Sequence, residues 1–422
     1  MDELPQPRIV PRAEHPISRK NIDPEALKVL YRLHDHGFIS YLVGGCVRDL
    51  LLGKTPKDFD LATDAHPQQV RELFRNSRLI GRRFRIAHVY FRGGKYIEVS
   101  TFRRKSEFDE DAENSHPPSE NTFGTPAEDA QRRDITINGI FYNIHDFSLI
   151  DYVGGLRDLQ NRLIRCIGDP EEKFRQDPVR MIRVVRHAAR TGFRIEEKTY
   201  QSLLRNGVEL NTCSRARVRD EFFRDLGEGA ARDSMELMLK SNLLTVLFPP
   251  LTRLSERGKL DGFFFNVLAA VDQQNRRGNP FPQDFTLTAF LLPFLFECVP
   301  WEDLPPGRRG QAVFRERVRD WVMEILGPLQ FTHRAKEAAI ELLAAQRIFQ
   351  EFLPKQRMPW FFPRKPYYPQ AKLLFDIGYR AAGEEPDRIN WQPDEKFPRK
   401  RKKRKNWHQR HNPSPQLPPQ NL

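Results

Sequence analysis

The sequence predicts an α+β fold, in which a mixed sheet occupies the first part of the chain and helices occupy nearly all of the rest. Short apolar or alternating runs before about residue 165, such as RFRIAHVYF and SLIDYVGG, are typical of strands. Beyond residue 165, segments such as DPVRMIRVVRHAARTGF carry apolar residues at helical spacing. The last segment, from Pro386, holds seven prolines and a basic run, and we expect it to be disordered.

The individual elements follow from local signals. An Asp-Pro start predicts a helix over NIDPEALKVLYRLHDHG, and SYLVGGCVRDLLLG predicts a strand, a Gly-Gly turn and a short helix that ends at Gly53. A helix near HPQQVRELFRNS precedes the strands RFRIAHVYF and KYIEVSTF, and RRDITINGIFYNI predicts a return to strand. Residues 105–128 are polar throughout, so we expect a long loop there, a length that is unusual unless the loop is functional.

The net charge of the chain is +13 at pH 7, and it is unevenly placed. From Lys396 to the C-terminus there are nine basic residues and no acid, so nine of the thirteen net charges lie in the last 27 residues. A surface of this kind attracts polyanions, and nucleic acid is the first candidate.

Cysteine usage and hydropathy indicate the compartment. Cys46, Cys166, Cys213 and Cys298 are far apart and form no Cys-x-x-Cys pair, so neither a zinc site nor a disulfide framework is predicted. The N-terminal segment lacks the apolar core of a signal peptide, and no run reaches about 18 uninterrupted apolar residues. We therefore expect a protein of the reducing cytoplasm that is not transmembrane.

Two carboxylates stand one residue apart in DFDLAT. In a β-strand Asp58 and Asp60 project from the same face, while Phe59 points into the core. Two carboxylates this close repel each other unless a cation lies between them, and Mg²⁺ prefers oxygen ligands that it shares with substrate phosphates. The alternative is that a lone Asp-x-Asp is a turn or strand end with solvated acids.

Neighbouring features favour the catalytic interpretation. The alternation in KYIEVSTF places Glu98 on the face opposite its apolar neighbours, where a third carboxylate can meet the same metals. Gly44, Gly45 and Arg48 supply the turn and the charge that a triphosphate needs. Two metal ions held here would activate an attacking hydroxyl and stabilise a leaving pyrophosphate.

The motifs LVGGCVRDLLLG, DFDLAT and RRDITINGI together resemble the class II nucleotidyltransferases, the family that includes CCA-adding enzymes and bacterial poly(A) polymerases. The resemblance runs from about His15 to Pro250, in order and with suitable spacing. It implies a palm-like head, a helical neck and body, dependence on Mg²⁺, and addition of nucleotides to an RNA 3′ end without a template. The site residues that it implies are the metal ligands Asp58 and Asp60, the third acid Glu98, and Arg132, Arg133 and Asp134 of the nucleotide pocket.

With this resemblance the chain divides into five expected parts. They are an N-terminal extension (1–23), a nucleotidyltransferase head (24–165), a helical neck that binds the base and RNA (166–250), a helical body that binds RNA (251–385), and the basic tail (386–422).

The stretch FRQDPVRMIRVVRHAARTGF is similar to the base-reading element of the family, in which an acidic pair precedes x-x-Arg. Here Gln176 replaces the first acid, which leaves Asp177 and Arg180 as the expected readers. A carboxylate and a guanidinium match the amino donor and ring-nitrogen acceptor of adenine and cytosine, and uracil or guanine would leave them unpaired. Alternatively, Asp177 is an ordinary N-cap before Pro178. Arg183 and Arg186 follow at a spacing of three, as phosphate contacts or as a solvated face.

Two segments bear on which branch of the family the chain resembles. RLIGRRFRIAHVYF matches a segment that marks the bacterial poly(A) polymerases, although it can also be only an alternating strand. The tail run RKRKKRK gives salt-dependent attraction to RNA of any sequence, which suits an enzyme that extends many RNA ends, or it is a solvated tail without a role. The expected RNA-binding residues there are Lys400, Arg401, Lys402, Lys403, Arg404 and Lys405.

The stretch PWFFPRKPYYPQ, residues 359–370, is aromatic and basic. It is consistent with a patch that contacts RNA and equally with a loop docked on the body.

The function we expect is template-independent RNA 3′-end adenylyltransfer, a poly(A) polymerase activity in RNA processing that uses ATP and Mg²⁺. The alternatives are a tRNA CCA-adding (or A- or C-adding) nucleotidyltransferase and an RNA-binding protein without catalysis. The expected partners are RNA 3′ ends and ATP, with RNA-decay proteins as a further candidate, no DNA template, and a monomeric state.

Overall fold

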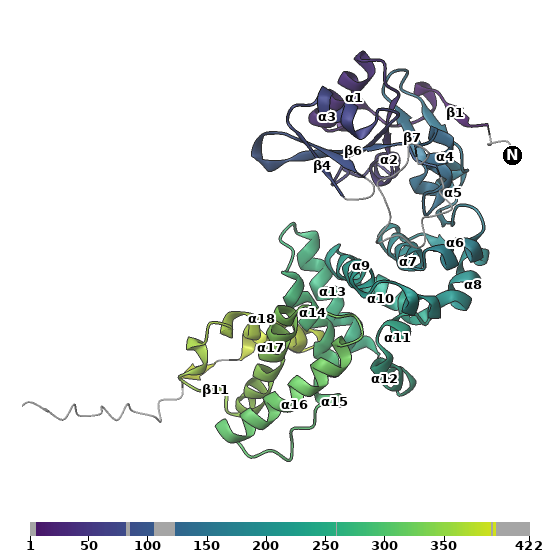
Figure 1. Cartoon of the computed structure of the whole chain (residues 1–422). Coiled ribbons are helices and arrows are strands. Elements are labelled where there is room, and N and C mark those ends of the chain that lie inside the picture. Colours follow the sequence, from purple (N-terminus) through teal and green to yellow (C-terminus); the bar gives the residue numbers. More distant parts are fainter. Residues whose placement is uncertain (1–5, 82–84, 105–122, 259, 390, 394–422) are drawn as a thin grey trace, which may run out of the picture.

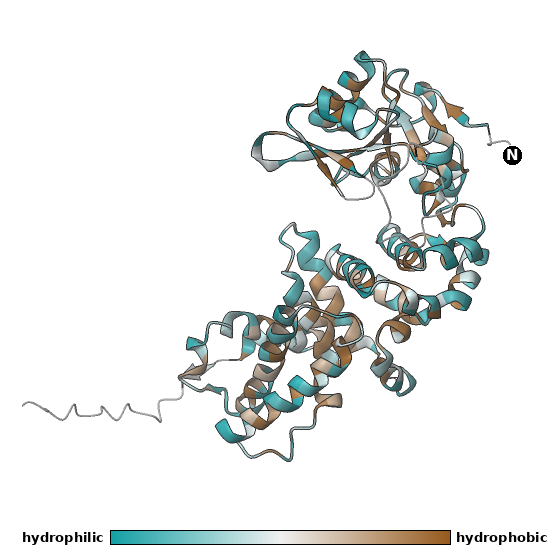
Figure 2. Cartoon of the chain, viewed as in Figure 1, coloured by the Kyte–Doolittle hydropathy of each residue, from teal (hydrophilic) through white to brown (hydrophobic). Residues whose placement is uncertain are grey.

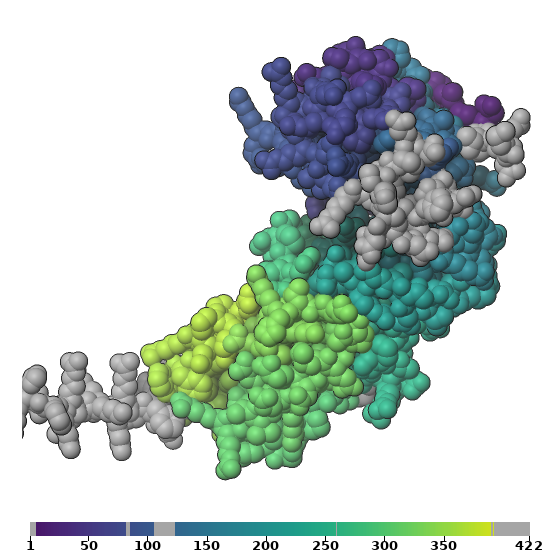
Figure 3. All heavy atoms as spheres, viewed as in Figure 1, coloured from purple at the N-terminus to yellow at the C-terminus, as the bar shows by residue number. Residues whose placement is uncertain are grey.

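The computed structural model describes residues 6–81, 85–104, 123–258, 260–389 and 391–393. The chain forms an arc with a head of sheet and helices at one end and a helical body at the other (Figures 1 and 3). Between them lies a row of helices, α6 to α12, which we call the neck. The body comprises α13 to α18.

The head is built on an eight-stranded sheet with the order β1-β8-β7-β2-β3-β6-β5-β4. Strands β3 and β6 pair in parallel, and the other neighbours pair antiparallel. The strands are β1 (Arg8–Val10), β2 (Ser40–Val43), β3 (Asp60–Thr63), β4 (Ser77–Ile80), β5 (Ile86–Tyr90), β6 (Tyr96–Thr101), β7 (Ile140–Asn143) and β8 (Leu149–Asp151).

The two faces of the sheet are buried by different helices. Helices α1 (Pro24–Asp35), α2 (Gly45–Leu51) and α3 (Pro67–Leu73) cover the face that carries Leu42 and Leu61. Helix α4 (Pro126–Gln131) packs through Ala130 on the opposite face, against Ala62 and Phe141. Because side chains alternate along a strand, Asp60 shares the α4 face with Ala62. This alternation directs the acid toward the segment that follows α4.

Helix α4 differs from the sequence prediction, which placed the first part of it in a long loop. Thr125 and Glu128 form a capping box, in which each side chain accepts a hydrogen bond from the other residue's backbone N–H. Pro126 stands at the first helical position, so the segment TPAE carries a complete helix start. The remainder of the expected loop, residues 105–122, lies outside the described residues.

The neck continues from the head through α5 (Gly155–Gln160) and two paired strands, β9 (Leu163–Ile164) and β10 (Arg194–Ile195). Its longest helices are α7 (Val179–Thr191) and α9 (Arg215–Gly227), which pack on α10. The other neck helices are α6 (Pro170–Gln176), α8 (Glu197–Asn206), α10 (Ala231–Lys240), α11 (Leu243–Leu247) and α12 (Thr252–Glu256).

The body is a bundle in which α14 (Gln283–Leu291) is buried along almost its whole surface. Figure 2 shows hydrophobic residues concentrated where the helices of the body meet. The remaining helices are α13 (Gly262–Arg276), α15 (Leu295–Cys298), α16 (Arg308–Leu326), α17 (His333–Phe352) and α18 (Tyr368–Ala381). The body also holds the strand pair β11 (Arg357–Met358) and β12 (Gln392–Pro393).

Two expected boundaries differ from the structure. The first segment is not an extension beside the fold, because β1 pairs with β8 and forms the edge of the sheet. The first part of the tail expected from Pro386 is ordered, because β12 pairs with β11, and residues 394–422 lie outside the described residues. In the part of the chain that the structure describes, no helix is both long and apolar enough to span a membrane.

Gly155 supplies a test of the head. A Cβ atom at this position would lie 2.2 Å from the carbonyl oxygen of Thr136 and 2.8 Å from Cγ1 of Ile140. We expect Gly155→Ala to lower the free energy of unfolding by roughly 2–4 kcal/mol, because backbone would have to move. Gly262→Ala is the matched control, since its Cβ would meet nothing within 4 Å. Urea unfolding curves that place both variants at one midpoint would contradict the packing described here.

Candidate active site

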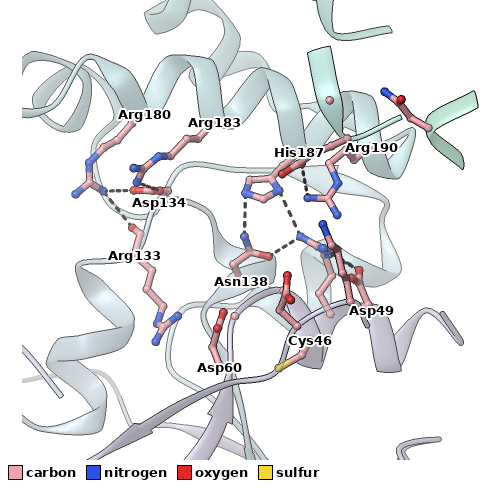
Figure 4. Close-up of a pocket in the computed structure, with 18 of the residues that line it drawn as sticks. Cys46, Asp49, Asp60, Arg133, Asp134, Asn138, Arg180, Arg183, His187 and Arg190 are labelled. Atoms are coloured by element: carbon pink, nitrogen blue, oxygen red, sulfur yellow. Dashed lines mark hydrogen bonds and ion pairs between the residues drawn. The ribbon is translucent and has the colours of Figure 1, made fainter. Parts of the chain in front are cut away.

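A pocket of about 770 Å³ lies where the head, the neck and the body meet (Figure 4). The head contributes the Gly-Gly turn, the acid pair and the segment after α4, the neck contributes one face of α7 and the end of α9, and the body contributes the turn after α13. The lining residues outside that acid pair are mostly cationic or glycine, which suits a ligand with several negative charges.

Asp58 and Asp60 lie at the head end of this pocket. Asp60 is the first residue of β3, where its Cα pairs with those of Val43 and Glu98, and Asp58 precedes the strand instead of lying within it. No side chain among the described residues donates a hydrogen bond to either carboxylate or forms an ion pair with it. Burial, followed by the negative charges of Glu98 and Asp58, raises the pKa of Asp60 to about 6, although Arg133 opposes the shift. The site therefore holds negative charge that lacks a partner.

Glu98 lies on the neighbouring strand but does not line the pocket. One of its carboxylate oxygens is 3.3 Å from Nε2 of His88, and its side chain is 41% exposed. His88 in turn stacks on Tyr96, with ring centroids 4.3 Å apart. Glu98 thus acts on Asp60 through its charge, and the structure does not bring it together with Asp58 and Asp60 in the pocket.

The Gly-Gly turn touches both the acids and the arginines. Gly44 has a φ of 76°, a backbone conformation that residues other than glycine rarely adopt. A Cβ atom there would lie 3.5 Å from Nη1 of Arg133 and 3.8 Å from Oδ2 of Asp60. Gly45, the first residue of α2, also lines the pocket. Both glycines line the pocket beside the acid pair, Gly44 buried and Gly45 partly exposed.

Arg48 differs from its expected role. Its guanidinium is 3% exposed and donates to Oδ1 of Asp49 at 2.9 Å and to Oδ1 of Asn138 at 2.9 Å, and it lies 3.4 Å from Nδ1 of His187. The Asn138 amide nitrogen is 3.2 Å from Nε2 of the same His187 (Figure 4). Arg48 therefore joins the head to α7 and is not free to bind a triphosphate in this conformation.

His187 is electrically neutral in this network. Burial, and then the positive charges of the arginines around it, of which Arg48 is the first, hold the pKa of His187 well below its usual range. Both groups that face the ring are donors, Nη1 of Arg48 and Nδ2 of Asn138, and a neutral imidazole can accept a hydrogen bond from only one of them.

Asp129 fixes the two arginines that follow α4. Its side chain is fully buried, and its carboxylate oxygens accept hydrogen bonds from Arg132 at 2.5 Å and from Arg133 at 2.8 Å. Burial alone would raise the pKa of Asp129, but the two guanidiniums outweigh it and lower the pKa. Arg133 is held from behind in this way, which leaves its Nη1 beside Gly44 and Asp60. All three predicted residues of this segment, Arg132, Arg133 and Asp134, line the pocket.

The arginines of α7 connect the head to the neck. Asp134 forms ion pairs with Arg180 at 2.9 Å and with Arg183 at 3.0 Å, and Arg183 forms a further ion pair with Glu221 of α9 at 2.9 Å. Arg186 is buried against Glu221 and Asp225, so it is neither a phosphate contact nor part of a solvated face.

Asp177 does not line the pocket. Its carboxylate lies 3.0 Å from Nη2 of Arg217 and 3.9 Å from Nε of Arg180. Asp177 ends α6, and no side-chain cap is found at the start of α7, so the interpretation of Asp177 as an N-cap is wrong. Arg180 does line the pocket, and its Nε atom is buried without an acceptor among the described residues.

Several pocket residues were not predicted. His187 and Arg190 continue the face of α7 that begins with Arg180 and Arg183, and this spacing of three and four residues was a signal in the sequence. Arg190 pairs with Glu228 at 2.7 Å, at the end of α9. The contribution of the body carried no such signal, because it depends on how distant helices meet; the residues concerned are Asn275, Gly278 and Pro280.

The donor set suits a divalent cation that is shared with a ligand. No three His, Cys, Asp or Glu side chains among the described residues are arranged to hold a metal ion by themselves. The unpartnered carboxylates of Asp58 and Asp60 are nonetheless hard oxygen ligands at the edge of a cationic pocket. Mg²⁺ is commonly bound by one or two carboxylates together with substrate phosphates and water. The expected RNA-binding residues 400–405 lie outside the described residues.

Asp60→Asn tests whether this carboxylate is an unpartnered charge. In metal-free protein we expect the variant to raise the free energy of unfolding at pH 8 by about 1–3 kcal/mol, because it removes a partly buried charge. A carboxyl with a raised pKa favours the folded state at low pH, so the advantage of the variant should shrink as the pH falls through about 6.

Thermal melts across this range, with and without Mg²⁺, provide the measurement. Mg²⁺ should stabilise the unsubstituted chain more than Asp60→Asn, because ligands that bind the folded state raise its stability. Equal stabilisation of both proteins would show that Asp60 holds no cation.

Comparisons with known proteins agree with this geometry. Residues 40–165 match the family model described as the poly A polymerase head domain, and residues 192–254 match the one described as a probable RNA and SrmB-binding site of polymerase A. Poly(A) polymerase I of Escherichia coli O6:H1 is 48% identical over 256 residues, which are 59% of this chain and 55% of that protein. Poly(A) polymerase I of Salmonella typhi is 47% identical over 65% of this chain and 62% of its own length. The chain thus spans somewhat more than half of these relatives.

CCA-adding enzymes are also similar. The enzyme of Lactobacillus helveticus is 38% identical over 52% of this chain and 54% of its own length. The crystal structure of the Bacillus stearothermophilus CCA-adding enzyme in complex with CTP superposes with a TM-score of 0.58 at 25% identity, over 87% of this chain and 81% of that one. The arrangement of a sheet-containing head followed by helices is shared with that structure. Residues 40–165 and 192–254 of this chain are thus similar to the head domain and to a probable RNA-binding region of poly(A) polymerases, and the chain shares the fold of a CCA-adding enzyme.

Proposed function

We propose that this chain is a template-independent poly(A) polymerase that adds AMP from ATP to RNA 3′ hydroxyl groups and releases pyrophosphate. One observation carries the proposal. The pocket places two unpartnered carboxylates, Asp58 and Asp60, at one end of a wall of arginines. Nucleotidyl transfer needs both halves of this arrangement, the acids for a divalent cation and the arginines for a polyphosphate.

Asp58 and Asp60 are the residues that would hold Mg²⁺. When bound there, Mg²⁺ would favour ionisation of the attacking hydroxyl and offset the negative charge on the leaving pyrophosphate. In the reaction the RNA 3′ oxygen forms a bond to the α-phosphorus of ATP, and the bond from that phosphorus to the bridging oxygen breaks. The hydroxyl proton is lost, and pyrophosphate leaves with the electron pair. Glu98 contributes a nearby negative charge that raises the pKa of Asp60 and increases the attraction of the acid pair for a cation.

The triphosphate is held by the backbone at Gly44 and by Arg133. Asp129 fixes Arg133 from behind, so its Nη1 donor is already oriented before a nucleotide arrives. Arg132 lies beside it, 28% exposed. Arg48 has a positioning role in this scheme, because its contacts with Asn138 and His187 keep the Gly-Gly turn in register with α7.

Base selection rests with Arg180 and Asp177. Arg180 has one donor, Nε, without an acceptor, and the Asp177 carboxylate lies 3.9 Å from it. A carboxylate and a guanidinium side by side match the amino group and ring nitrogen of adenine, and cytosine offers the same order. Release of Asp177 from Arg217 would turn the carboxylate toward the base. The pair favours ATP or CTP over UTP and GTP.

The identity of the relatives favours AMP addition over CCA addition. The poly(A) polymerases match at 47–48% identity and the CCA-adding enzyme of Lactobacillus helveticus at 38%. The basic run that ends the sequence would hold RNA of any sequence, which suits many substrates better than one. RNA 3′ ends are thus the proposed partner. The match to a probable RNA and SrmB-binding site supports a protein partner of the RNA-processing machinery as well.

Extension of two labelled RNAs tests the function. One is a generic oligoribonucleotide, the other a tRNA without its CCA end, each given Mg²⁺ with ATP, with CTP or with both. We expect long tails on both RNAs with ATP alone. Growth restricted to the tRNA that stops within about three nucleotides would favour the CCA-adding alternative.

Asp58→Ala and Asp60→Ala should each abolish incorporation while RNA binding remains. If the unsubstituted chain binds RNA but incorporates nothing, it is an RNA-binding protein without catalysis.

Asp177→Ala tests base selection. The variant should lose about 10- to 100-fold in kcat/KM for ATP and much less for UTP, because the ATP amino group loses its acceptor. Arg217→Ala is the control, since it removes the partner of Asp177 and leaves the carboxylate in place. The ratio of kcat/KM for the two nucleotides is the measurement. An Asp177→Ala ratio equal to that of the unsubstituted chain would remove Asp177 from the scheme.

A further inference from the structure

Two aromatic rings lie side by side on the body, remote from the pocket, with a guanidinium over each ring. The guanidinium of Arg364 lies over the ring of Trp360, with 5.0 Å to the ring centroid. Trp360 meets Phe361 edge to face, with centroids 6.2 Å apart at 89°. Arg308, the first residue of α16, lies over Phe361 at 5.5 Å. We call these four residues the body patch.

Trp360 is exposed in its loop, whereas residues on either side of it are buried in the body. Met358 and Phe362 are buried on either side, and Phe362 packs edge to face on Phe349 of α17 at 5.1 Å. Trp360 between them is 37% exposed, which is unusual for a side chain of this size and hydrophobicity. The segment is therefore a docked loop, one of the two interpretations given for residues 359–370, and it presents one aromatic ring outward.

The cations around this ring lack acidic partners. Arg317 and Arg319, further along α16, pair with Asp303 at 2.7 Å and with Glu337 at 2.6 Å. The exposed cations near the patch form no ion pair with any of the described residues; they are Arg308, Arg309, Arg315, Lys355, Arg357, Arg364 and Lys365. An unpaired cluster repels itself, so it indicates a surface that a polyanion completes.

Strand β11 ends two residues before Trp360 in the sequence. Strand β12 pairs in parallel with β11, so Gln392 lies beside Arg357, close in sequence to Trp360. The sequence that follows carries the basic run from Lys396. Figure 1 shows β11 at the end of the arc opposite the head. Trp360, two residues after β11, therefore lies at the end of the body remote from the head.

We propose that the body patch binds single-stranded RNA upstream of the reacting 3′ end, with a base stacked on Trp360 and phosphates held by Arg308 and Arg364. That the ligand is RNA rests on the proposed function. An exposed ring needs an unstacked base, so the site favours a single strand over a duplex, and stacking accepts every base. RNA held at this end of the arc while its 3′ end occupies the pocket would stay bound through successive additions.

Fluorescence anisotropy of labelled RNA without ATP tests the proposal. The probes are a single strand of roughly 20 nucleotides, which exceeds the usual ~4–16-nucleotide site, and a blunt duplex of the same length. Trp360→Ala in the full chain should bind the single strand about tenfold more weakly and the duplex with little change. Leu373→Ala is the matched control, because Leu373 is an equally exposed hydrophobic residue of the body. Its binding should equal that of the unsubstituted chain.

The salt dependence of RNA binding distinguishes the contribution of the cations from that of the aromatic ring. Arg308→Ala with Arg364→Ala should reduce the slope of log K against log salt by about 1.4, which is roughly 0.7 for each phosphate on a single strand. Trp360→Ala should leave that slope unchanged. Arg317→Ala with Arg319→Ala removes the same charge from paired arginines and should change the slope less.

Equal binding of the single strand by Trp360→Ala and Leu373→Ala, or an equal loss on single strand and duplex, would overturn the proposal. The binding measurement contains no ATP and does not depend on catalysis. A chain that cannot add AMP would therefore contradict the proposed function without changing the interpretation of the binding data.

Discussion

The site depends on the ion pairs that tie the head to the neck. Asp134 of the head holds Arg180 and Arg183 of α7, and Arg183 continues to Glu221 of α9. Loss of one partner would leave a largely desolvated charge, which costs more than the intact pair contributes to stability. These ion pairs thus fix the orientation of α7 relative to the sheet. Without that orientation the carboxylates at the sheet edge and the arginines of the helix would not share one pocket.

Within the pocket the two signs of charge are treated differently. Asp129 binds one side of the Arg133 guanidinium and so orients it, which leaves the other side facing the pocket. The acids at the other end have no such partner among the described residues, and burial, followed by the charges of Glu98 and Asp58, raises the pKa of Asp60. This difference is the basis for proposing that the arginines bind a polyphosphate and the carboxylates a metal ion.

Sequence reasoning located the parts of this site that are local. Asp58 and Asp60, the Gly-Gly turn and the segment after α4 are short motifs whose chemistry is visible in the residues themselves, as is the class of fold. It did not find that Arg48 is occupied by Asn138 and His187, because Arg48 and these two partners come from three separate segments. The body wall of the pocket and the covering of Asp177 by Arg217 likewise depend on helix packing, which no local pattern encodes.

The claim that everything else depends on is that Asp58 and Asp60 hold a cation together with a nucleotide. Anomalous diffraction from crystals grown with Mn²⁺ and a non-hydrolysable ATP analogue tests it directly. The account predicts an anomalous peak within coordination distance of both carboxylates and of a phosphate oxygen, with the triphosphate beside Gly44 and Arg133. A nucleotide in this pocket with no metal at the two acids, or a metal held elsewhere, would contradict it.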